Sequence, residues 1–147
     1  MVILIIMSAV QRPPQSVRDL EIWQKAMTLV EACYKLSSTL PRDERFGLIS
    51  QIRRAATSVP ANIAEGFGRW NAPDFARFLA ISSGSLRELE THLVIVQRLG
   101  FASKDSVDTI LCATEELSRM LFRMRQRVLT NGNKSEFPRR SSTAKSC

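Results

Sequence analysis

The sequence contains few of the residues that build disulfides or metal sites. Three cysteines occur in 147 residues. Since they cannot all pair and no Cys-x-x-Cys spacing is present, they exclude a disulfide framework and a zinc ribbon. A single histidine, His92, excludes a histidine-rich metal site within one chain. We therefore expect no metal, no cofactor and a reducing, cytoplasmic compartment.

Long hydrophobic runs are also missing. Residues 1–7 are apolar, but a membrane helix needs about 20 apolar residues, and a secretory signal needs a basic region before a longer apolar stretch. We therefore expect no membrane partner and no signal peptide. Two interpretations of the run stay open: translation starts at Met1, or it starts at Met7 and the run follows an upstream start codon.

Glycine and proline, six of each, are few, and most of them stand at the boundaries of predicted elements. With 44% hydrophobic and 24% charged residues, the composition is that of one globular domain. The net charge is +7, of which residues 130–147 supply +3 from four bases and one glutamate. The chain therefore divides into a flexible segment at 1–16, a folded domain at 17–130 and a disordered basic tail at 131–147.

Four segments carry apolar residues at helical spacing, and none shows the alternation of a strand. The predicted helices cover residues 17–40, 43–67, 71–100 and 104–129. Helices of about 22–27 residues are about 33–40 Å long and, when joined by short loops, pack antiparallel. The sequence predicts an all-α fold, an antiparallel up-down-up-down four-helix bundle.

The start of the first predicted helix and its core face follow from local spacing. Ser16 and Asp19 have the spacing of a capping box, and Pro41 stops the helix. Steps of three and four residues define an apolar stripe, which we expect to face the core: Leu20, Trp23, Met27, Val30, Cys33 or Tyr34, and Ser37 or Leu40.

Two helical positions conflict with local propensity. Pro60 lacks an N–H and crowds the carbonyl of Ala56, so we expect either a kink or a helix restart capped by Ser58. Water would satisfy the freed carbonyl if that face is exposed. Residues 82–85 are serines and Gly84, and a mid-helix glycine costs up to about 1 kcal/mol. Close approach of another helix would compensate.

The sequence contains no residue pattern typical of a catalytic, metal-binding or phosphate-binding site. Glu88 stands one turn before His92, yet helical spacing brings no serine or cysteine nucleophile near them. A carboxylate metal site in a bundle uses Glu-x-x-His pairs, which do not occur. Residues 66–68 lack the lysine and the preceding strand of a phosphate loop. We expect no catalytic, cofactor-binding or metal-binding residue, and therefore no enzyme.

Arginines form the candidate nucleic-acid site. Arg119, Arg123 and Arg127 are spaced i, i+4 and i+8, so one helix face carries three guanidinium groups, and Arg53 and Arg54 add two more. Arginine forks bind phosphate bidentately, which predicts contact with RNA or DNA. The alternative is that the late arginines only complement the helix dipole and face solvent.

A polar line beside the apolar stripe of residues 43–67 forms the candidate assembly surface. Its members are Gln51, Ser58, Asn62 and Glu65. The serine–glycine patch at 82–85 is the counterpart on the next helix. A solvated face explains these residues, and so does self-association through close-packed polar helix faces.

Three motifs resemble a known family. They are Asp19-Leu-Glu-Ile-Trp-Gln24, the segment Gln51-Ile-Arg-Arg-Ala-Ala-Thr-Ser-Val-Pro-Ala-Asn-Ile-Ala-Glu-Gly66, and Gly84-Ser-Leu-Arg-Glu-Leu-Glu90. Over residues 17–129 the chain resembles the four-helix bundle family of the bacterial 23S ribosomal RNA intervening-sequence protein. This family also includes the accessory variability protein of diversity-generating retroelements. The apolar start and the basic tail depart from the family pattern.

The resemblance implies a small bundle that assembles into a homo-oligomeric ring, most often a pentamer. It implies no catalytic residue, because most members have no established activity. The retroelement member binds nucleic acid and a reverse transcriptase, so the implied partners are a second copy, RNA or DNA, and a reverse transcriptase or other protein. A structural adaptor without nucleic-acid binding is the alternative. The motif positions that we carry over as assembly residues are Gln51, Ser58, Asn62, Glu65, Gly66, Gly84, Ser85 and Glu88.

Overall fold

The computed structural model describes residues 14–69 and 71–132. These residues form four α-helices and two short 3-10 helices, η1 (Val17–Asp19) and η2 (Arg42–Phe46). The α-helices are α1 (Glu21–Ser38), α2 (Leu48–Gly68), α3 (Ala72–Arg98) and α4 (Lys104–Gly132). The predictions for residues 1–13 and for the tail from residue 133 lie outside the described residues.

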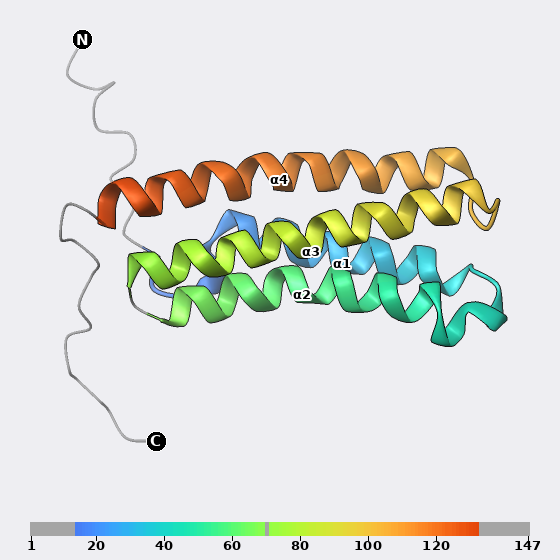
Figure 1. Ribbon diagram of the computed structural model, residues 1–147, viewed down its shortest axis with the longest axis horizontal. Helices are drawn as coiled ribbons and strands as arrows, with labels where there is room; N and C mark the ends of the chain where they lie inside the picture. The colour runs from blue at the N-terminus through green and yellow to red at the C-terminus, as the bar shows by residue number, and fades with distance from the viewer. Residues whose placement is uncertain (1–13, 70, 133–147) are drawn as a thin grey trace, which may run out of the picture.

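The four α-helices run alternately up and down along one long axis (Figure 1). Each packs against the next in the chain, and α4 closes the bundle against α1. The predicted up-down-up-down four-helix bundle is confirmed. Among the helices of the described part, none is both long enough and apolar enough to cross a membrane.

The predicted capping box is present, but the first two α-helices begin later in the chain than predicted. Ser16 and Asp19 make the predicted capping box, yet it begins the short η1, and the extended Leu20 separates η1 from α1. The segment predicted as the start of the second helix is instead η2, and α2 begins only at Leu48. There the Glu44 carboxylate accepts a hydrogen bond from the Leu48 N–H at 3.1 Å, which satisfies one of the free N–H groups of the first turn.

In α2, α3 and α4 the core lies along apolar residues at helical spacing, which include Ile52, Leu86 and Leu121. The stripe predicted for the first helix was partly right: Leu20, Cys33 and Leu40 are buried, whereas Met27 and Tyr34 are 36% and 42% exposed. The buried stripe of α1 is Ile22, Ala26, Leu29, Cys33 and Leu36. Met27 and Tyr34 follow Ala26 and Cys33 by one residue and are therefore turned about 100° around the helix from the buried stripe. The larger side chains of the predicted stripe therefore lie at the edge of the core.

Pro60 lies inside a helix that continues to Gly68, so the predicted restart at Ser58 is wrong. The ring is buried, which means that the face is not one where solvent water would satisfy the freed carbonyl. Next to it, the buried Ser82 hydroxyl donates to the Val59 carbonyl at 3.1 Å. A side chain of α3 thus supplies a hydrogen bond to the backbone of α2 beside the proline.

Candidate nucleic-acid interface

The three predicted arginines of α4 are exposed. Arg119 lies 4.0 Å from the Glu115 carboxylate, whereas Arg123 and Arg127 form no ion pair with another described residue. Arg123 and Arg127 line a shallow pocket between α4 and the start of α1, together with the single carboxylate of Glu21. This end of α4 therefore presents more positive than negative charge to solvent.

Arg53 and Arg54, although adjacent in sequence, contact different neighbouring helices. The Arg54 guanidinium pairs with the Glu88 carboxylate of α3 at 2.9 Å and also donates to the Gln51 side chain at 2.6 Å. Its charge is therefore compensated within the bundle. Arg53 turns towards α1, where its Nε donates to the Ser37 hydroxyl at 2.8 Å and its guanidinium stacks on the Tyr34 ring.

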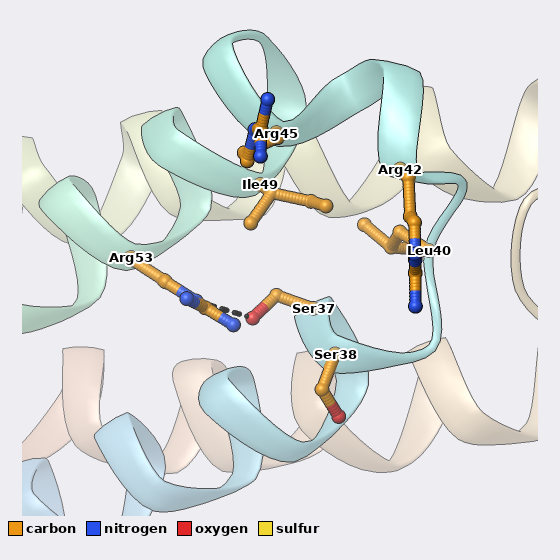
Figure 2. Close-up of a pocket in the computed structure, with 7 residues that line it drawn as sticks. All are labelled: Ser37, Ser38, Leu40, Arg42, Arg45, Ile49 and Arg53. Atoms are coloured by element: carbon orange, nitrogen blue, oxygen red, sulfur yellow. Dashed lines mark hydrogen bonds between the residues drawn. The ribbon is translucent and has the colours of Figure 1, made fainter.

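Arg53 lines a pocket between the end of α1, η2 and the start of α2 (Figure 2). Arg42 and Arg45 of η2 line the same pocket, and sequence reasoning missed both. Arg45 and Arg42 precede Arg53 by 8 and 11 residues, but they lie in η2, before α2 begins at Leu48, so the periodicity of α2 does not extend to them. The only sequence signal is their density, since four arginines fall within residues 42–54.

The polar residues of the candidate assembly surface meet between α2 and α3. The Ser58 and Ser85 hydroxyls are 2.7 Å apart, and the Asn62 amide donates to the Ser58 hydroxyl at 3.0 Å. Glu88 extends this line through its ion pair with Arg54. These residues therefore link two helices of one chain, and their half-buried hydroxyls and amide are already hydrogen-bonded there.

The remaining motif positions have different surroundings. Glu65 pairs with Arg69 one turn later on α2, at 2.6 Å. Gly66 is buried, and a Cβ built on it would lie 2.5 Å from the Phe78 Cβ of α3. Gly84 is exposed, and a Cβ there would have nothing within 4 Å. The helix approach predicted for residues 82–85 therefore occurs at Ser82 and Ser85, which hydrogen-bond to α2, but not at Gly84 itself, and an unpredicted close approach occurs at Gly66.

The described residues contain no group of three or more histidine, cysteine or carboxylate side chains placed to hold a metal ion. His92 Nε2 lies 3.6 Å from the Glu88 carboxylate, but that carboxylate already pairs with Arg54. The Cys33 thiol is buried in the core, where desolvation raises its pKa to about 12. Its nucleophilic thiolate is therefore scarce at neutral pH.

We expect Cys33 to resist thiol reagents in the folded protein, because it is buried and protonated, whereas the exposed Cys112 should react quickly. The double variant Cys112→Ser, Cys147→Ser isolates Cys33. Labelling by a chromogenic disulfide should be slow until denaturant is added. Because the folded-state pKa is raised, Cys33 contributes stability below about pH 8.5, and this contribution should diminish towards pH 12. Rapid native labelling of the double variant would contradict the buried position.

Comparison with known proteins supports the fold and the family. The model of the 23S rRNA-intervening sequence protein family matches residues 18–123. The crystal structure of a protein of unknown function from the S23 ribosomal protein family of Bacteroides thetaiotaomicron is similar, with a TM-score of 0.67 and 23% identity. The similarity covers 71% of this chain and 98% of that one. No curated protein gives a significant match. Because the family model matches well over half of the length of this chain, the chain belongs to the 23S rRNA-intervening sequence protein family.

Proposed function

We propose that this protein is a non-enzymatic, homo-oligomeric helical bundle that binds the phosphate backbone of nucleic acid through α4. The observation that carries the proposal is the exposure of Arg123 and Arg127, neither of which forms an ion pair with another described residue. Unpaired arginine forks are well suited to phosphate oxygens. Phosphate contacts carry no sequence information, so RNA and DNA duplexes should bind with little sequence preference.

The five arginines predicted from the sequence do not contribute equally to this proposal. Arg119, Arg123 and Arg127 share one exposed face, while Arg54 is engaged by Glu88 and Arg53 faces a separate pocket. The nucleic-acid surface is therefore the α4 face alone. Binding of labelled RNA and DNA duplexes, measured at several salt concentrations, tests it, because phosphate contacts weaken with salt in a predictable way.

We further propose that the bundle assembles into a ring, a pentamer by family resemblance. Gly84 supports assembly, because it stands in the middle of α3 without any contact that a Cβ would disturb. Glycine costs helix stability there, and nothing in the described chain compensates for that cost. Ile81, one turn earlier, is 41% exposed, which adds an apolar contact to the same face. Packing of a second copy against this face would use both features.

Gly84→Leu should dissociate the oligomer without unfolding the monomer, because the added side chain has free space within its own chain. Light scattering after size exclusion should give a reduced mass, while the helical circular dichroism signal is retained. Ser50→Leu, on an exposed position of α2, serves as a control for added surface hydrophobicity. A wild-type chain that is monomeric at micromolar concentration would contradict the ring.

A protein-docking adaptor is the second candidate. Phe122 is 60% exposed on α4, between Arg119 and Arg123, and Leu129 is exposed two turns later. An exposed apolar side chain beside charged ones is typical of an interface, in which a polar rim surrounds an apolar core. A reverse transcriptase, which the family resemblance implies, or another protein with an acidic surface would be the partner. Binding of such a partner without any affinity for RNA or DNA would favour this alternative.

A further inference from the structure

The pocket lined by Arg53 gathers positive charge without a carboxylate. Its volume is about 370 Å³, and its lining residues are Ser37, Ser38, Leu40, Arg42, Arg45, Ile49 and Arg53. The nearest acidic residues in sequence, Asp43 and Glu44, are not among them. The Glu44 carboxylate is occupied by the Leu48 N–H. Three arginines therefore line one recess with no lining acid to neutralise them, although the Arg45 guanidinium stacks on the exposed Phe46 ring.

Arg53 is held in place before any ligand binds. Its Nε donates to the Ser37 hydroxyl at 2.8 Å, and that hydroxyl donates to the Tyr34 carbonyl at 3.0 Å. The guanidinium carbon lies 4.7 Å from the centre of the Tyr34 ring. These contacts fix the Nε side of the group and leave its two Nη groups for a ligand. A pre-positioned donor loses less conformational entropy on binding.

The other residues that line the pocket also favour binding of an anion. Arg42 and Arg53 reach into the recess from opposite sides, with Ser37 between them (Figure 2). Arg42 forms no ion pair with another described residue. Leu40 is buried and Ile49 is half-buried, so part of the lining is apolar and has a low dielectric constant. Clefts with charge of one sign and low-dielectric walls concentrate the field and attract the opposite charge.

We propose that this pocket binds a phosphomonoester. A terminal phosphate carries up to two negative charges and three free oxygens, which suit several arginine forks at once. A phosphate inside a nucleic-acid strand has one charge and is flanked by sugars on both sides, so it fits a recess less well than a terminal group does. The volume lies in the lower part of the range of small-molecule sites, about 300–1,000 Å³, and leaves room for the group attached to the phosphate.

The pocket is separate from the arginine face of α4. The pocket lies at the carboxyl end of α1, while the recess lined by Arg123 and Arg127 includes residues at the amino end of α1. An 18-residue helix is about 27 Å long, so the two positive regions are distinct. Failure of one proposal therefore leaves the other unaffected.

The test titrates the full chain with inorganic phosphate at constant ionic strength, using chloride as the reference anion. Calorimetry should show saturable binding, and the melting temperature should rise with phosphate concentration, since a ligand of the folded state stabilises it. Arg42→Gln should weaken binding by about tenfold or more, because it removes charge-assisted hydrogen bonds. Arg42 makes no ion pair with another described residue, so this variant should fold normally.

Arg18→Gln is the matched control, because Arg18 is exposed in η1, beyond the other end of α1. This variant should bind phosphate as the wild type does. Adenosine monophosphate, a 5′-phosphorylated oligonucleotide and its 5′-hydroxyl form distinguish the sources of the phosphate. A preference for the phosphorylated strand that Arg42→Gln abolishes would assign a nucleic-acid end, while binding of the mononucleotide alone would assign a free ester. Equal binding by Arg42→Gln and the wild type, or no saturation by any of these probes, would overturn the proposal.

Discussion

Replacing Arg119, Arg123 and Arg127 with glutamine should flatten the salt dependence of duplex binding by about three units of log K against log salt. Each phosphate contact on a duplex contributes about 0.9 to this slope, because binding releases condensed counterions. The effect should appear equally with RNA and DNA and with different sequences. In a ring every subunit repeats the arginine face, so a flattening of three units applies if one subunit makes most of the contacts.

The triple variant should still fold, because its three side chains are exposed and lie off the core line of Leu117, Leu121 and Val128. A triple variant of Arg18, Arg77 and Arg98 to glutamine is the matched control, since it removes the same charge from exposed positions elsewhere. Its slope should change much less. A variant that lacks residues 131–147 measures how much the basic tail contributes to binding. If that deletion abolishes binding while the α4 variant retains it, the α4 face is only a solvated surface.

Gly66→Ala should lower the free energy of unfolding by about 1–3 kcal/mol, the usual cost of overpacking a filled core. The new methyl group would lie 2.5 Å from the Phe78 Cβ and 3.0 Å from a ring carbon of Phe75. These contacts are with the next helix, so α2 and α3 would have to separate. Urea denaturation, with a midpoint shift at constant slope, measures the change.

Gly68→Ala is the control for helix propensity. It lies two residues later on α2, is exposed, and has nothing within 4 Å of the added Cβ. Alanine is favoured over glycine in a helix by up to about 1 kcal/mol, so this variant should be as stable as the wild type or slightly more so. Equal stability of the Gly66 and Gly68 variants would show that packing against α3 does not require a glycine at position 66.

The sequence determined the features that depend on residues close together in the chain. Four apolar periodicities gave the four α-helices, because spacings of three and four residues define a helix face without knowledge of its partner. Asn71 caps α3 through a local contact of this kind, since its side chain needs only the Asp74 N–H three residues on. The arginine face of α4 is of the same kind, because its residues lie one turn apart on one helix.

The tertiary structure decided the features that depend on which faces meet. The sequence of α1 offers two neighbouring apolar stripes, and only packing against α2 and α4 shows that Ala26 and Cys33, rather than Met27 and Tyr34, lie in the core. Successive helix residues are about 100° apart, so Arg53 and Arg54 belong to different helix interfaces. The positions of Arg53 and Arg54 in the sequence do not show which neighbouring helix each of them faces.

The anion pocket and the two glycines illustrate the same limit. Arg42 and Arg53 meet in one recess only because η2 turns the chain back beside the end of α1. Gly66 and Gly84 are both helical glycines, and local propensity treats them alike. The Phe78 and Phe75 side chains of α3 leave no room for a Cβ at Gly66, while a Cβ at Gly84 would have nothing within 4 Å, because close packing is a property of the facing surface.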